Sequence, residues 1–140
     1  MATTTATITL NSSDMMDSAI SLSNTATLTN AGTDTGVTKT TGLTRLTTSS
    51  VSNVVLLNSG ASGGLQEQET MTGGKVFIQN LNDRGDGTKY VTVLLTAVEI
   101  GRLYGGDWCF FPWAGSTGKD VEITPSSTTD TTLEYCVFYE

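Results

Sequence analysis

None of the 140 residues is histidine, and this absence removes a large part of enzyme chemistry. Without an imidazole there is no Ser-His or Cys-His nucleophile pair, no histidine-ligated zinc and no histidine general base. A pair of carboxylates could still hydrolyse a glycoside, but the Asp and Glu residues are scattered among expected turns. We therefore predict that the chain is not an enzyme and has neither catalytic residues nor a cofactor.

Cysteine is almost as scarce, since only Cys109 and Cys136 are present. Two thiols neither complete a structural zinc site nor form a disulfide framework, so we expect no metal site. We interpret both as buried free thiols on core strands. A disulfide between them is the alternative that the sequence leaves open.

Basic residues and long apolar runs are also few. Seven Lys and Arg stand against fourteen Asp and Glu, which gives a net charge of −7. No basic stripe could neutralise phosphates, so we expect no nucleic acid and no anionic membrane as partner. The longest apolar run is about five residues, and the first residues lack the basic and apolar regions of a secretory signal. We therefore expect neither a membrane span nor a leader.

Hydroxyl side chains dominate instead, with 27 threonines and 13 serines. Threonine is β-branched and favours a half-buried pleated surface. The segments 3–10 and 19–30 alternate apolar and hydroxyl residues with a period of two, which is typical of strands with one wet face. About eight such segments are separated by Gly, Asn, Asp and Pro turns. This pattern predicts a single all-β domain, an antiparallel β-sandwich of the jelly-roll type.

Two parts of this domain differ in composition, at residues 1–50 and 51–140. The first part ends in a short echo, "TGVTKT" followed by "TGLTRL", with too few apolar residues for a core of its own. We interpret it as an extended Thr-rich N-terminal arm that orders on a neighbouring subunit. Its cations Lys39 and Arg45 could then dock on an acidic surface. A solvated loop is the equal alternative.

The second part contains the denser strand pattern. "KVFIQNL" predicts a strand, and "KYVTVLLTAVEI" (89–100) predicts one long central strand that is apolar on both faces. The terminal segment "TTLEYCVFYE" places Leu133, Tyr135, Val137 and Tyr139 on one side. Between 59 and 74 a glycine-rich connection allows one helical turn, at 66–69.

The segment "GDWCFFPW" (106–113) holds four of the ten aromatic residues. Alternation places Trp108, Phe110 and Pro112 on one face, and Cys109, Phe111 and Trp113 on the other. One face fills the core, and the other requires a cover, because an apolar patch of that size marks an interface. A core strand without an interface and a carbohydrate-stacking platform are the two alternatives. Pro112 cannot donate to a ladder, which predicts a strand end or a sheet edge.

The segment "NDRGDGT" (82–88) contains an Arg-Gly-Asp tripeptide and three oxygen-bearing side chains that calcium could use. These side chains belong to Asn82, Asp83 and Asp86. Their spacing does not match a calcium-binding loop, and the two glycines suit a hairpin turn. We interpret the segment as a turn.

The tract "KVFIQNLND…TKYVTVLL…EIGRLYGGDWCFFPWAG…KDVEITPSST…LEYCVFYE" resembles small virion structural proteins of tailed bacteriophages, particularly those that infect marine cyanobacteria. "RLYGGDWCFFPW" is the most specific part, and the beginning with "TGVTKTTGLTR" also resembles such proteins. The resemblance implies a non-enzymatic virion component on the outer surface of the particle, made in the host cytoplasm. Small, acidic, β-rich decoration (cement) proteins of the head fit best.

The resemblance and the residues together predict a homo-oligomer, a trimer by preference, that binds the major capsid protein or another virion protein. The expected interface residues are Val37, Lys39, Leu43, Arg45, Trp108, Phe110, Phe111 and Trp113. A neck, tail or fibre-associated role is one alternative. A carbohydrate-binding module for host-surface glycans, with the same tryptophans stacking on sugars, is the other.

Overall fold

The computed structural model of the chain describes residues 4–13, 19–28, 36–37, 39–58, 66–67, 74–115 and 118–139. The chain divides into two compact units, Met1–Thr38 and Lys39–Glu140. The described residues form strands and turns and contain no helix, so the predicted all-β antiparallel sandwich is confirmed. The first unit ends at residue 38, whereas the change in amino-acid composition predicted a division after residue 50.

The first unit is a two-stranded hairpin. Strand β1 (Thr5–Ser12) pairs antiparallel with β2 (Ile20–Thr27), and Leu10 lies opposite Leu22. The strands and the alternation predicted for these segments are confirmed. The prediction of a single wet face is wrong, because the aliphatic side chains are exposed as well as the hydroxyl ones. Hydroxyls bond across the strands, Thr7 to Thr25 at 2.9 Å among them.

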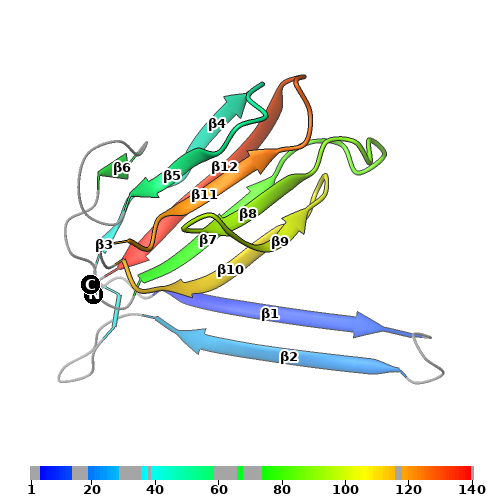
Figure 1. Cartoon of the computed structure of the whole chain (residues 1–140). Helices are drawn as coiled ribbons and strands as arrows, with labels where there is room; N and C mark the ends of the chain where they lie inside the picture. The colour runs from blue at the N-terminus through cyan, green and yellow to red at the C-terminus, as the bar shows by residue number, and fades with distance from the viewer. Residues whose placement is uncertain are drawn as a thin grey trace. The chain divides into compact units, whose positions relative to one another are not determined.

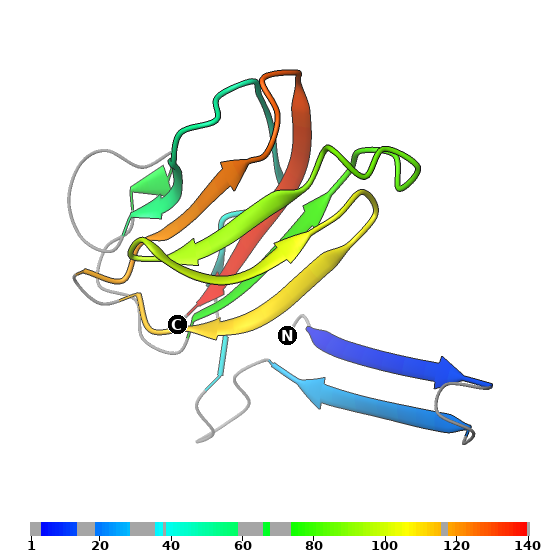
Figure 2. The same cartoon turned by 45° about the vertical axis from the view of Figure 1, so that its right-hand side comes forward.

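The second unit is a sandwich of two sheets (Figures 1 and 2). Its strands are β3 (Lys39–Thr40), β4 (Thr44–Thr48), β5 (Val54–Asn58), β6 (Gln66–Glu67), β7 (Gly74–Asn80), β8 (Val91–Leu95), β9 (Val98–Leu103), β10 (Trp108–Trp113), β11 (Val121–Pro125) and β12 (Thr131–Tyr139). One sheet has the order β10-β7-β12, with β3 and β4 both on the far side of β12, and the other has β6-β5-β11-β8-β9. The chain crosses between the sheets at nearly every connection. This is the strand order of a jelly roll.

Two short strands replace the predicted arm. Strand β4 pairs with the first half of β12, and β3 pairs with its end, so together they form one interrupted edge strand. At the interruption the Thr41 hydroxyl accepts the amide of Val137 at 3.0 Å, and Gly42 takes a left-handed φ of 75°. Lys39 and Arg45 therefore belong to the sandwich of their own chain. Local sequence does not reveal this pairing, because the partner strand lies about ninety residues later.

The predicted long strand at 89–100 is also wrong, because the chain turns back at Thr96 and Ala97. Both residues have a positive φ, 49° and 62°, in a tight hairpin between β8 and β9. Such a turn normally uses Asn or Gly. Here distant groups support it, since the Thr96 hydroxyl donates to the Gly118 carbonyl at 2.7 Å and the Ala97 amide donates to Glu122 at 3.0 Å. The helical turn predicted at 66–69 is contradicted at Gln66–Glu67, which form β6, parallel to β5.

The core lies between the two sheets and is built mostly from alternate strand residues, with the consecutive Leu56 and Leu57 of β5 as an exception. Its fully buried members include Val76 and Ile78 of β7, Ile123 of β11, and Leu133 and Tyr135 of β12. The predicted inward side of the terminal strand is thereby confirmed. Among the described residues, the Tyr135 hydroxyl is the one buried side-chain polar atom without a hydrogen-bond partner. That orphan group reduces stability, because its hydration is lost without replacement.

One polar side chain at the end of the core is fully satisfied. Asn80 donates from Nδ2 to the carbonyls of Lys89 (3.0 Å) and Leu103 (2.9 Å), and its Oδ1 accepts the amide of Asn82 at 3.0 Å. Its backbone bonds to the turn that leads into β10, through Asp107 and Gly106. Asn80 therefore links the end of β9 to two connections, the one from β7 to β8 and the turn that leads into β10.

Candidate functional site: the aromatic outer face of one sheet

Strand β10 presents aromatic side chains on both of its faces. It pairs with β7 so that Trp108 lies opposite Gln79 and Trp113 lies opposite Gly74. Trp108 is 48% exposed and Trp113 only 3% exposed, which confirms that the two faces have different surroundings. In the described sheet β10 is an edge strand, as Pro112 predicts.

The inner face of β10 belongs to the core. Trp113 packs in the hydrophobic cluster, and Cys109 and Phe111 pack against it. The Trp113 indole donates from Nε1 to the carbonyl of Lys119 at 2.5 Å, so its polar atom is satisfied. Neither Trp113 nor Phe111 is thus placed to meet a partner, although both were predicted at the interface.

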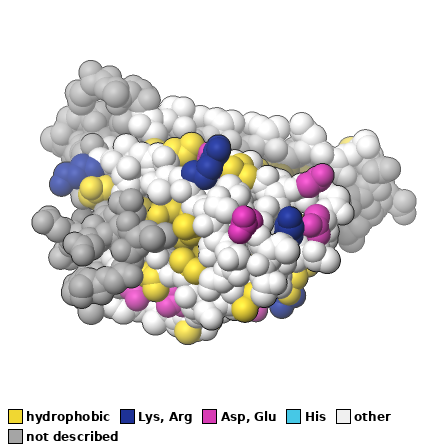
Figure 3. Space-filling view, turned by 90° about the horizontal axis from the view of Figure 1, so that it is seen from above, with side chains coloured by type: hydrophobic (Ala, Val, Ile, Leu, Met, Phe, Trp, Pro, Cys, Tyr) yellow, Lys and Arg dark blue, Asp and Glu magenta, His cyan; other side chains and the backbone are white. Residues whose placement is uncertain are grey.

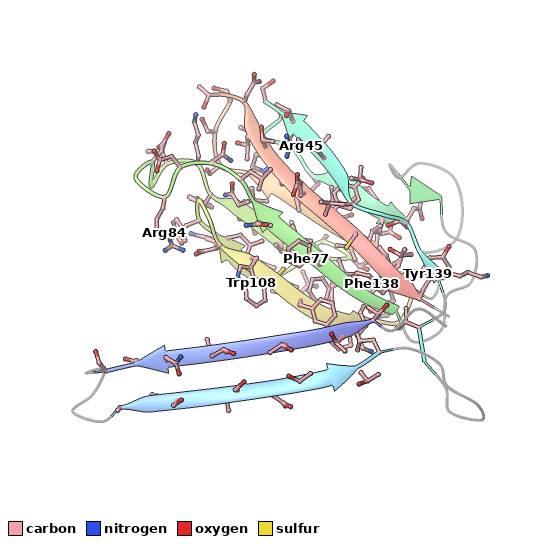
Figure 4. All side chains as sticks on the ribbon, turned by 180° about the vertical axis from the view of Figure 1, so that it is seen from behind. Arg45, Phe77, Arg84, Trp108, Phe138 and Tyr139 are labelled. Atoms are coloured by element: carbon pink, nitrogen blue, oxygen red, sulfur yellow. The ribbon has the colours of Figure 1, made fainter. Side chains whose placement is uncertain are left out.

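The outer face of the same sheet carries the aromatic side chains that remain. Phe110 of β10 lies opposite Phe77 of β7, and Phe77 lies opposite Cys136 of β12. Phe138, two residues after Cys136, extends the row. Figure 4 shows Phe77, Trp108 and Phe138 on these three neighbouring strands. We call Phe77, Trp108, Phe110 and Phe138 the outer patch.

The rings of the outer patch contact one another in pairs. Phe77 and Trp108 have ring centroids 6.4 Å apart at an interplanar angle of 32°, and Phe110 and Phe138 lie 6.5 Å apart at 62°. These distances are in the range of favourable aromatic pairs. Phe77, Phe110 and Phe138 are half-buried, so Trp108 is the most accessible ring. The outer patch is therefore a pre-arranged apolar surface with one prominent indole.

A polar row runs along one border of the outer patch. Across four strands the register places Arg45, Glu134, Gln79 and Trp108 in line. Arg45 binds one carboxylate oxygen of Glu134 through Nε (3.0 Å) and Nη2 (2.5 Å). Because the two charges are paired with each other, this border adds hydrogen-bonding groups without a net charge. The predicted role of Arg45 as a free cation on an arm is thus replaced by an ion pair on this sheet.

The other predicted interface residues do not belong to β7, β10 or β12, the strands that carry the outer patch. Val37 belongs to the first unit, where it is buried and its amide donates to the carbonyl of Leu28 at 2.5 Å. Lys39 lies in β3 with its ammonium 5.8 Å from the centroid of the Tyr139 ring. Leu43 is exposed just before β4. Of the predicted set, Trp108 and Phe110 come together in the outer patch, and Arg45 lies on its border.

The two cysteines are free and cannot pair, because β7 separates their strands and their side chains lie on opposite faces of the sheet. Burial raises the pKa of the Cys109 thiol to about 11 and also raises the pKa of Cys136. A nucleophilic cysteine needs the opposite shift, toward the thiolate. Both are structural thiols, in agreement with the interpretation as free cysteines.

The segment 82–88 is a turn stabilised by its own side chains. Asp83 Oδ1 accepts the amide of Gly85 at 2.9 Å, and Asp86 accepts the amide of Thr88 at 3.1 Å. Bonds from Thr88 lower the pKa of Asp86. Arg84 is ion-paired with Asp107. Within the described residues no group of three or more His, Cys, Asp or Glu side chains could hold a metal ion.

Phe77 and Phe138 are site residues that were not predicted from the sequence. Both occupy positions where the alternation of their strands predicts solvent, as in "KVFIQN", and an aromatic residue at such a position was the available signal. It became informative only with the register, since Phe77 and Phe138 are distant from β10 in the sequence. On the face drawn in Figure 3, acidic and basic side chains are interspersed and no basic stripe crosses the surface.

No helix in the part of the chain that the structure describes could cross a membrane. Neither the known family models nor the curated proteins contain a match to this chain.

Proposed function

We propose that the chain is a non-enzymatic structural protein of a bacteriophage particle, a capsid decoration protein that binds the major capsid protein through the outer patch. The observation that carries this proposal is an apolar face, with Trp108 48% exposed, on a sheet whose opposite face already fills the core. Aromatic side chains at the centre of a contact contribute most to protein–protein affinity.

The fold supports the proposal by analogy. Jelly rolls recur in viral capsid proteins, where the sandwich is a rigid building block. The same fold also occurs in lectins, so the fold alone does not select the function. The composition of the site adds to the case: the outer patch has no carboxylate pair or activated thiol beside it, and its rings suit burial against protein.

The proposal is tested with particles that lack the chain, mixed with purified protein and sedimented. The double variant Trp108→Ala/Phe110→Ala should bind on the order of 100-fold more weakly, the effect of losing two central anchors. The matched control is Val98→Ala/Ile100→Ala in β9 of the other sheet, because Ile100 is 49% exposed and Val98 65% exposed. Equal binding by both variants would exclude the outer patch. Binding to tails but not to heads would support the neck, tail or fibre alternative.

A carbohydrate-binding function is the second candidate, because of the polar row that ends at Trp108. An exposed indole flanked by an amide, a carboxylate and a guanidinium offers both stacking and hydrogen bonds to a sugar. The stacking residue would be Trp108, since Trp113 is buried in the core. Glycans that quench tryptophan fluorescence in the native chain but not in Trp108→Ala would support this candidate over capsid binding.

A further inference from the structure

The hairpin β1–β2 has one face whose polar side chains bond to one another and one face of exposed aliphatic side chains. On the hydroxyl face, Thr7 bonds Thr25 (2.9 Å), Thr9 bonds Ser23 (3.3 Å) and Ser21 donates to Asn11 (2.9 Å). These bonds close a ladder of side chains between the two strands. This face therefore needs no partner.

The opposite face is aliphatic and open to solvent. Ile8, Leu10, Ile20 and Leu22 are 36–56% exposed, and Ala6 lies opposite Ala26 at the end of the same face. A two-stranded hairpin is marginally stable in water unless its apolar face packs on something. The aliphatic face is thus the part of the first unit that requires a cover.

The pattern of this face repeats within the hairpin. Residues 8–12 read Ile-Thr-Leu-Asn-Ser and residues 20–24 read Ile-Ser-Leu-Ser-Asn. The register sets Leu10 opposite Leu22, with Ile8 and Ile20 at diagonal positions on either side. A half-turn about the middle of the Leu10–Leu22 pair exchanges the two strands and leaves the aliphatic pattern unchanged. A second hairpin would thus meet the same four side chains in either direction.

Charge also favours contact between copies at this place. Neither 4–13 nor 19–28 contains a charged residue, whereas the chain as a whole carries −7. Copies of an acidic protein repel one another, and this repulsion is weakest where the approaching surfaces are neutral. The two strands therefore offer an apolar face without charge, and the acidic residues of this segment, Asp14 and Asp17, fall in the connection between them.

We propose that the hairpin is a self-association element, whose aliphatic face packs on the same face of a second copy of this chain. Two sheets that pack face to face form a dry layer of interdigitated side chains, as in any sandwich. A symmetric contact of this kind buries the same patch on both copies. The inference goes beyond the proposed function, because it concerns the isolated chain and holds whether or not the outer patch binds a capsid.

The test uses the full-length chain without any particle, with its mass measured by light scattering. At about 10 µM we expect the mass of a dimer, because a contact that uses the same face on both copies is complete with two chains. The double variant Leu10→Thr/Leu22→Thr introduces residues that favour strands, and it should raise the dissociation constant on the order of 100-fold because two apolar side chains are lost from the contact. Val98→Thr/Ile100→Thr is the matched control and should leave the mass unchanged. A native chain that is monomeric, or a control that dissociates equally, overturns the proposal.

A second measurement identifies the face and does not depend on the folding of the double variant. Leu22→Cys should form an interchain disulfide under mild oxidation, and Ser23→Cys, one residue further and on the hydroxyl face, should not. The native thiols give little background, because burial raises the pKa of Cys109 and Cys136. Equal cross-linking at both positions would overturn the face-to-face arrangement. A native chain that forms the oligomer but does not bind capsids would contradict the proposed role of the outer patch. It would leave the self-association of the hairpin unaffected.

Discussion

The two faces of the sheet β10-β7-β12 are made of similar residues, but the inner face packs in the core and the outer face forms a partly exposed surface. Each carries a tryptophan, an amide and a cysteine: Trp113, Asn80 and Cys109 on the inner face, and Trp108, Gln79 and Cys136 on the outer face. The inner set packs in the core or donates to fixed carbonyls. The outer set borders or forms a surface with one prominent exposed ring. Composition alone therefore does not separate folding residues from binding residues, whereas the register does.

The largest effect is expected from the two tryptophans. Trp113→Ala removes a buried ring and leaves a cavity, so it should lower the free energy of unfolding by about 4 kcal/mol. Trp108→Ala removes a half-exposed ring and should cost about 1 kcal/mol or less. Urea denaturation of both variants gives the comparison. Similar losses would mean that the two faces are equally buried in the folded chain.

The two amides of β7 should differ next. Asn80→Ala leaves two carbonyls and an amide without their partner, and we expect a loss of about 3 kcal/mol in the free energy of unfolding. Gln79→Ala, one residue away on the outer face, should change it by less than about 0.5 kcal/mol. Thermal unfolding with the same buffer checks both. A stable Asn80→Ala protein would show that the loops at the start of β10 hold themselves in place.

The smallest effect concerns the cysteines and appears only at alkaline pH. Burial raises the pKa of Cys109 from its ordinary value of 9.0 to about 11. The thiol ionises earlier in the unfolded chain than in the folded one, so the native protein loses stability as pH rises from 9 to 11. Cys109→Ala should lose less over this range, as measured by urea denaturation at pH 8, 9, 10 and 11. An unchanged pH dependence would contradict the burial of this thiol.

Much of the fold could be predicted from local pattern. The period of two in 3–10, 19–30 and 131–140 identified the strands β1, β2 and β12, and in β12 it also identified the inward side. The octet 106–113 gave the two faces of β10 correctly. Segments whose conformation depends on distant groups could not be predicted. The turn at Thr96–Ala97 depends on Gly118 and Glu122, and the edge formed by β3 and β4 depends on β12.

Only two of the four residues of the outer patch could be predicted from the sequence. Trp108 and Phe110 follow from the sequence, whereas Phe77 and Phe138 join them through pairings that no local pattern specifies. Val37, Leu43 and Lys39 were predicted on an arm, and none of them belongs to the strands that carry the outer patch. The ion pair of Arg45 and Glu134 shows why such residues are hard to assign from sequence. Arg45 reads as an unpaired cation, but its partner carboxylate lies 89 residues later in the chain.

The central claim is that Trp108 and its neighbours are covered by protein in the working assembly. A cryo-EM map of the proposed assembly, phage heads with this chain bound, tests it most directly. We predict that density of a capsid subunit packs against the outer patch while Trp113 stays inside the jelly roll. An outer patch that faces open solvent on the particle, with the chain attached through another surface, would contradict the account.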